Sequence, residues 1–360
     1  MVTVLDKANK IEEIDKSNML NDLVNTPNYC LDAMQRANQV NVPKGLNPKN
    51  VVLVGMGGSA IGGEILKDWL RDVLTIPVEV CRDYFLPAYV NKDSLVFVNS
   101  YSGNTEETLS AFSSAVQRNC TLLAITSGGK LENLCIKLQV PYVKIPSGLQ
   151  PRVGIPYMFF PLPVLMEKAG LLTNVAAELN EAIAVLEQVC KTIAPDVPTK
   201  DNHAKQLATK LVGAIPVVYG FGQYGSVAHR LKAQFNENSK VHSRFDVFPE
   251  LNHNETVGYE APEFLNEKHS VILIRDHQES PEIRARIETT TKFVFSRAKN
   301  VLTLQVSGEG KLAKMFSVLY TGDFASVYLA ILQGIDPTPV TIIDTIKSEL
   351  ATKKQQSRNV

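Results

Sequence analysis

The chain has 360 residues and a mass of 39.7 kDa, a length typical of two domains or one large one. Its 37 basic and 37 acidic residues cancel, and 44% hydrophobic with 21% charged residues is ordinary globular composition, which argues against disorder and against a broad polyanion-binding surface. Because no run of Lys and Arg supplies several phosphate contacts at once, we expect no nucleic-acid partner.

The cysteines and the N-terminal segment indicate the compartment. The five cysteines are widely spaced and never form a C-x-x-C pair, so we expect neither a disulfide framework nor a zinc site. Charged residues stand at 6–13, where an export signal needs an apolar stretch. The longest apolar run, Val153 to Met166, has 14 residues and three prolines, fewer than the ~20 that cross a bilayer. We therefore expect a cytoplasmic protein without a membrane partner.

The first half of the chain alternates between strand and helix patterns. A polar, helical segment from about Ile11 to Val40 precedes an apolar strand at 51–54, a glycine turn and a helix that runs to 71. A further helix is predicted at 105–119. Further apolar runs that predict strands stand at 77–80, 94–100, 121–126 and 141–145. Strands separated by helices predict a parallel sheet with helices on both faces.

The second half repeats this pattern. The run at 215–237 again reads as strand, G-x-G turn and helix, and Gly220 and Gly222 correspond to Gly55 and Gly57. Further strands are predicted at 270–276 and 300–306, and helices at 281–298, at 323–333 and after Pro339. We therefore predict an α/β protein with an N-terminal helical segment (1–40), a first module (41–170), a helical connector (171–202) and a second module with a C-terminal helix (203–360).

The first glycine turn is a candidate anion site. In GMGGSAIGG, at 55–63, small residues after a strand let a ligand approach the backbone and the amides at the start of a helix. Its frame also matches the G-x-G-x-x-A dinucleotide fingerprint, which leaves an NAD-dependent oxidoreductase open, with Asp83 a loose candidate for the acidic partner. A turn needed only for packing is the alternative.

A second candidate stands at the end of the strand at 94–100. In NSYSGNTEET, at 99–108, the hydroxyls of Ser100, Ser102 and Thr105 precede a helix with two early glutamates. Hydroxyls and helix N–H groups bind phosphate without a lysine, because the helix dipole supplies the positive end. Helix capping alone explains one of these hydroxyls, but not three.

Together, these two motifs resemble the sugar isomerase (SIS) fold, a phosphosugar-binding module. The remaining motifs resemble the bifunctional phosphoglucose/phosphomannose isomerases, over residues 40 to 360. These motifs are QPRVGIPY (150–157), FNENSK (235–240), FPELNHNE (248–255) and DPTPVTIIDTIK (336–347). The resemblance implies two tandem three-layer αβα modules, each with a mainly parallel sheet, and a cytoplasmic homodimer with a shared active site that acts in glycolysis and gluconeogenesis.

The resemblance also implies roles for single residues. Arg152 lies beside the reacting carbons and Glu237 is the base. His253 opens the sugar ring from the partner subunit, and Lys347 is an acid near the ring oxygen. The residues implied to hold the substrate phosphate are Gly58, Ser59, Ser100, Ser102 and Thr105. No cofactor and no metal is implied.

The chemistry of these residue types suits the implied reaction, in which glucose 6-phosphate and mannose 6-phosphate are interconverted with fructose 6-phosphate through a cis-enediol. A carboxylate moves a proton between C1 and C2, and a guanidinium stabilises the charge that develops on the two oxygens. A histidine suits ring opening because it titrates near neutrality.

Other interpretations stay open at this point. A phosphosugar sensor would bind ligand without turning it over, and an isomerase on this fold could act on amino sugar phosphates. His242, Asp246, Glu250 and His253 form a possible metal cluster, although their spacing matches no common motif. Acceptance of both C2 epimers requires room for rotation of the open chain. The resemblance implies a threonine near C3 or C4 that makes this room, and the sequence does not choose among Thr338, Thr341 and Thr345.

Overall fold

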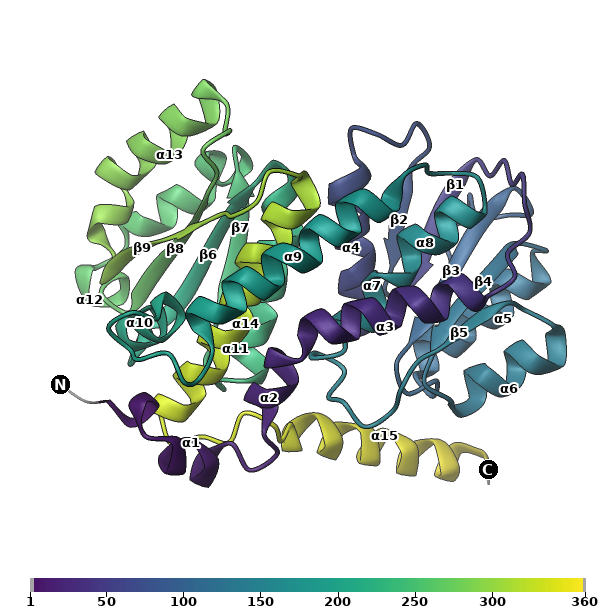
Figure 1. Cartoon of the computed structure of the whole chain (residues 1–360), viewed down its shortest axis with the longest axis horizontal. Coiled ribbons are helices and arrows are strands. Elements are labelled where there is room, and N and C mark those ends of the chain that lie inside the picture. The colour runs from purple at the N-terminus through teal and green to yellow at the C-terminus, as the bar shows by residue number, and fades with distance from the viewer. Residues whose placement is uncertain (1–2, 359–360) are drawn as a thin grey trace.

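The computed structural model describes residues 3–358, which form two parallel sheets side by side with helices packed around and between them (Figure 1). The first sheet has the order β2-β1-β3-β4-β5 and the second the order β7-β6-β8-β9. The strands of the first sheet are β1 (Asn50–Val54), β2 (Val78–Cys81), β3 (Ser94–Ser100), β4 (Thr121–Thr126) and β5 (Tyr142–Lys144). Those of the second are β6 (Ile215–Phe221), β7 (Arg244–Phe248), β8 (His269–Arg275) and β9 (Asn300–Gln305).

Helices cover both sheets, which confirms the predicted tandem α/β architecture. Every residue of β1 and β3 is buried, as expected for central strands of a parallel sheet that is covered on both faces. The helices of the first module are α4 (Gly58–Leu70), α5 (Glu106–Gln117), α6 (Gly129–Leu138), α7 (Ile155–Phe159) and α8 (Pro161–Lys168). Those of the second include α10 (His203–Leu211), η2 (Gly222–Tyr224), α11 (Gly225–Glu237), η3 (Glu250–His253), η4 (Glu255–Glu260), α12 (Glu263–Asn266), α13 (Pro281–Phe293) and η5 (Phe295–Arg297).

Two long helices join the modules. α9 (Val175–Ile193) crosses the front of the molecule in Figure 1 and packs on α14 (Lys311–Leu332). The Tyr328 hydroxyl donates to the carbonyl of Ile193, 2.6 Å away, and the Tyr320 hydroxyl donates to the carbonyl of Leu23 at 2.7 Å. These buried hydroxyls fix α14 against both α9 and the N-terminal helices.

Among residues 3–358, α14 alone is long and apolar enough, by length and composition, to cross a membrane. In the structure, however, 94% of that apolar window is buried. This burial is typical of a core helix. It also explains why only 323–333 is predicted as helix from the sequence: a helix buried on all sides lacks the alternation of apolar and polar faces that marks helices.

Three segments differ from the predictions. The single helix expected from Ile11 to Val40 is interrupted, because the Asp15 carboxylate accepts the backbone N–H groups of Met19 and Leu20, both at 2.9 Å, and so caps a new helix. Strand β7 has no sequence prediction, since its edge position leaves it only partly buried. The helix expected at 281–298 ends at Phe293.

The N-terminal elements are η1 (Val4–Asp6), α1 (Ala8–Ile14), α2 (Met19–Val24) and α3 (Thr26–Gln39). The helix predicted after Pro339 is observed as α15 (Thr341–Arg358).

Candidate active site

The two hydroxyl-rich and glycine-rich turns meet at one edge of the first sheet. They follow β1 and β3, which are parallel neighbours, so their carboxyl ends lie side by side. Gly57 adopts a φ of +49°, which favours glycine, and α4 begins at the next residue. The backbone N–H of Tyr101 donates to Ser59 Oγ at 3.1 Å, which ties the second turn to the start of α4.

The hydroxyls of the second turn bond to one another as well as to the backbone. Thr105 is the N-cap residue of α5, yet its hydroxyl makes no capping bond and accepts one from Ser100 Oγ at 3.1 Å. Ser102 is exposed, and its Oγ accepts the N–H of Asn104 at 3.3 Å. Capping therefore does not account for the hydroxyls of Ser100 and Thr105. The structure places the five predicted phosphate residues on these two adjoining turns.

The segment that carries Arg152 approaches the first turn closely. A Cβ atom on Gly58 would lie 2.7 Å from the Pro151 carbonyl oxygen and 3.3 Å from the Arg152 nitrogen. These are backbone atoms, so any side chain at position 58 would push the two segments apart. Glycine at 58 therefore lets Arg152 sit beside the start of α4.

The Arg152 guanidinium is buried between the two modules, with its residue 3% exposed. Its Nε donates to Asn238 Oδ1 at 2.5 Å, and its Nη2 donates to the carbonyls of Pro337 and Thr338, both at 2.7 Å. Burial lowers the pKa of Arg152 from its ordinary value, and the facing carboxylate of Glu237 opposes this effect. The side chain thus binds two segments of the second module, at Asn238 and at 337–338.

Glu237 faces this guanidinium from the end of α11. Its Oε2 lies 3.7 Å from Arg152 Nη1, and its side chain is 31% exposed. The structure therefore brings the predicted base together with the guanidinium that is predicted to stabilise the developing charge, beside the start of α4. No pairing of these two residues is evident in the sequence, where they are far apart.

A buried ion pair between Arg230 and Asp323 supports the position of Arg152. Arg230 Nη2 donates to Asp323 Oδ2 at 2.7 Å and also to the Arg152 carbonyl at 2.8 Å. Gln234 Nε2 donates to Asp323 Oδ1 at 2.9 Å. No motif in the sequence singles out these residues, although an aspartate inside the apolar run of α14 indicates a buried pair. The Arg152 backbone is thereby tied to α11 and α14.

His253 and Lys347 lie elsewhere in the structure. His253 ends the short helix η3 and Lys347 lies on α15, and both are exposed. Within residues 3–358, no hydrogen bond or ion pair joins either residue to Arg152 or Glu237. The same part of the chain contains no group of three metal-ligating side chains, so the histidines and carboxylates at 242–253 do not assemble into a cluster.

The second glycine turn differs from the first because a side chain accepts a hydrogen bond from an amide at the start of the helix that follows it. The N–H of Ser226, at the start of α11, donates to Asp68 Oδ2 of α4 at 2.7 Å. By contrast, no side chain within the described range caps α4. The Asp68 carboxylate of the first module therefore occupies the position at the start of α11 where an anionic ligand would otherwise bind. Burial raises the pKa of Asp68, which Ser226 opposes.

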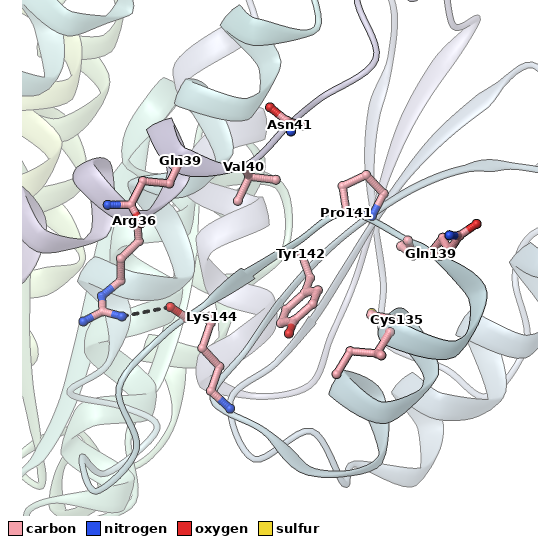
Figure 2. Close-up of a pocket in the computed structure, with 11 residues that line it drawn as sticks. Arg36, Gln39, Val40, Asn41, Cys135, Gln139, Pro141, Tyr142 and Lys144 are labelled. Atoms are coloured by element: carbon pink, nitrogen blue, oxygen red, sulfur yellow. Dashed lines mark hydrogen bonds between the residues drawn. The ribbon is translucent and has the colours of Figure 1, made fainter.

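A cavity of about 560 Å³ lies away from these residues, beside the edge strand β5. Figure 2 shows that α3 lines one side through Arg36 and Gln39, and the Arg36 guanidinium donates to the carbonyl of Lys144 at 3.2 Å. None of the predicted site residues lines this cavity. The candidate active site is instead the region where the turns of the first module meet α11 and the 336–338 turn.

Comparisons with known proteins agree with this geometry. Residues 46–150 match the SIS domain family, and residues 200–350 match the bacterial phospho-glucose isomerase C-terminal SIS domain family. The chain is similar to the bifunctional phosphoglucose/phosphomannose isomerase of Caldicellulosiruptor bescii, with 40% identity over 93% of this chain and 100% of that protein. The protein of the same description from Aquifex aeolicus is 35% identical over 86% of this chain and 93% of its own length. A glucose-6-phosphate isomerase-like protein from Thermus thermophilus shares the fold, with 16% identity, a TM-score of 0.60 and coverage of 92% and 96%.

The Asp68 contact yields a stability prediction. Asp68→Ala removes the acceptor of a helix N-terminal amide that is buried between the modules, and we expect the free energy of unfolding to fall by about 1–2 kcal/mol. Urea denaturation measures this change. Asp72→Ala is the control: Asp72 pairs with Lys311 at the surface, where solvent screens the pair, so its loss is expected to leave the free energy of unfolding nearly unchanged. Equal losses for the two variants would show that the Asp68 cap contributes nothing.

Proposed function

The chain belongs to the family of bifunctional phosphoglucose/phosphomannose isomerases, and we propose that the pair of Arg152 and Glu237 carries out its reaction. The protein is an aldose–ketose isomerase that acts on sugar phosphates. It interconverts glucose 6-phosphate and mannose 6-phosphate with fructose 6-phosphate. The observation that carries the residue assignment is the 3.7 Å approach of Arg152 Nη1 to Glu237 Oε2 beside the two turns.

The substrate phosphate binds where the two turns of the first module meet. Gly58 offers its backbone amide at the uncapped start of α4, whose dipole favours an anion, and Ser59 offers its hydroxyl, because the Ser59 N–H donates to the Met56 carbonyl. Ser100, Ser102 and Thr105 offer hydroxyl groups from the adjoining turn. This arrangement binds a phosphate through neutral donors and leaves the positive charge of Arg152 for the reacting end of the sugar.

Proton transfer takes place at the other end of the substrate. The Glu237 carboxylate takes the proton from C2 of the open-chain aldose and returns it to C1, through a cis-enediol. The Arg152 guanidinium lies beside O1 and O2 and stabilises the negative charge that develops there. Because Arg152 is already fixed by three hydrogen bonds, no reorganisation of its side chain is needed in the transition state.

Ring opening precedes this step and uses groups from a second subunit. The assembly is a homodimer in which His253 of each subunit completes the site of the other, and Lys347 acts near the ring oxygen. Both side chains are exposed, which supports this proposal, because a residue that acts in the active site of a neighbouring subunit must lie on the surface of its own subunit. The imidazole suits proton transfer near neutral pH.

Among the three candidate threonines, Thr338 is the one that shapes the sugar site. Its carbonyl accepts a hydrogen bond from Arg152, and its own buried hydroxyl has no hydrogen-bond partner among the residues that the structure describes. Thr345, by contrast, is exposed on α15, where its hydroxyl donates to Thr341. A short side chain at 338 leaves room for rotation of the open chain, so that one base reaches C2 of either epimer.

The cellular setting is proposed on chemical grounds. The five cysteines are all free thiols, which is typical of proteins in a reducing cytoplasm. Interconversion of hexose 6-phosphates is a step of glycolysis and gluconeogenesis.

The first test replaces the base. Glu237→Gln keeps the shape of the side chain but not its basicity, so we expect kcat for both aldoses to fall about 10²–10⁴-fold with little change in phosphosugar affinity. A coupled assay of fructose 6-phosphate formation, in the presence of a chelator, measures turnover. Glu263→Gln, on the exposed start of α12, is the control and should retain full activity. A wild-type protein that binds phosphosugar but converts neither aldose would instead favour a sensor.

The second test concerns the substrate range. Thr338→Leu fills the space beside Arg152, and we expect the ratio of mannose 6-phosphate to glucose 6-phosphate turnover to change about tenfold. Kinetics with each aldose measure this ratio. Thr345→Leu on α15 is the matched control, and an equal effect of both substitutions would contradict the assignment of Thr338.

The third test asks which subunit supplies the histidine. Glu237→Gln and His253→Ala chains are co-expressed with different tags, and the heterodimer is purified through both. A site that takes Glu237 from one subunit and His253 from the other is intact once per heterodimer, so we expect about half of the wild-type activity. A heterodimer as inactive as the two parent homodimers would show that His253 acts within its own subunit.

A further inference from the structure

Lys240, three residues beyond the proposed base, is bonded to the backbone around it. Its Nζ donates to the carbonyl of Glu237 at 2.5 Å, to that of Pro337 at 3.0 Å and to that of Asn238 at 3.4 Å. Its backbone has a φ of +55°, which brings the chain sharply round after α11. All three ammonium donors are therefore used, and all three acceptors are carbonyl groups at the candidate site.

The Pro337 carbonyl links this lysine to the reaction. It accepts both from Lys240 Nζ and from Arg152 Nη2, which lies 2.7 Å away, so two cations converge on one oxygen. The charged groups that face Lys240 are Arg152 from the first module, Glu237 on α11 and Asp336 on the following turn. Across residues 3–358, its Nζ forms no ion pair with a carboxylate, so its charge adds to the field of Arg152.

We propose that Lys240 is a positioning residue for the isomerisation, whose ammonium group fastens the end of α11 to the Pro337 turn and so holds Glu237 against Arg152. This inference rests on the proposed roles of Arg152 and Glu237. The positive charge has a second effect, because it lies beside the region where the enediolate develops and stabilises that anion.

This role makes the reaction sensitive to alkaline pH. Burial, and then the neighbouring Arg152, lower the pKa of Lys240 to about 8, from the usual lysine value of about 10.4. The ammonium form is complete below this pKa and is lost as the pH rises through it. Deprotonation removes one N–H donor and the positive charge together, so kcat/KM falls above pH 8.

The test compares kcat and KM between pH 6 and 10 for the full-length wild-type protein and for Lys240→Gln, Lys240→Arg and Lys232→Gln, with fructose 6-phosphate as substrate. Lys240→Gln is expected to lower kcat about tenfold or more at pH 7, to change KM less than about threefold and to abolish the alkaline fall. Lys240→Arg keeps the charge, so it should retain activity and move the fall to higher pH. Lys232, on the same helix α11, is the control and should leave the profile unchanged.

The outcomes separate the two proposals. If the wild-type protein does not convert hexose 6-phosphates, the proposed function fails. If the wild-type protein is active, Glu237→Gln is inactive and both Lys240 variants keep the wild-type pH profile, the role of Lys240 alone is overturned. Should Lys240→Gln fail to fold, as judged by circular dichroism, the profile of Lys240→Arg decides: an unshifted alkaline fall contradicts the proposal.

Discussion

The buried guanidinium of Arg152 is the interaction on which the arrangement of the two modules depends. It comes from the first module, and its hydrogen-bond acceptors at Asn238, Pro337 and Thr338 come from the second. Removing these acceptors while the modules stay packed would leave a buried charge without partners, which costs several kcal/mol. The contact that joins the modules is thus also the contact that sets the geometry of the candidate site. The ion pair of Arg230 and Asp323 extends this contact into the core.

The duplication of the α/β unit has two different outcomes. In the first module, the glycine turn leads into an uncapped helix, where an anion fits. In the second, the equivalent helix α11 is capped at its start by Asp68, and its far end carries Glu237. In the proposed mechanism, the first module binds the phosphate, while α11 of the second module contacts the first module at its start and supplies the base at its end. Neither module contains the proposed reaction by itself.

The sequence predicts the sheets better than the helices around them. The runs at 94–100 and 121–126 are observed as strands with the same bounds, because buried parallel strands are continuous apolar runs. The interruption of the N-terminal helix depends on one carboxylate, Asp15, and an apolar helix such as α14 has no periodic signal.

At the candidate site, the sequence likewise predicts single residues but not how they come together. Motifs single out Arg152 and Glu237, but their approach depends on how two distant segments pack, which spacing does not encode. Lys240 lies within a recognised motif, yet only its contacts reveal a role.

The way in which Glu237 is held fits the demands of a base that serves two carbons. Its backbone carbonyl is fixed by Lys240, whereas its carboxylate makes a single ion pair with Arg152 at a distance of 3.7 Å, longer than a hydrogen bond. A carboxylate fastened on all its oxygens would have to break bonds before it could move from C2 to C1. A carboxylate on a mobile backbone would lose the alignment that makes the proton transfer fast. A fixed backbone with a free carboxylate avoids both costs, and it lets the same base address either epimer while the guanidinium stays in place.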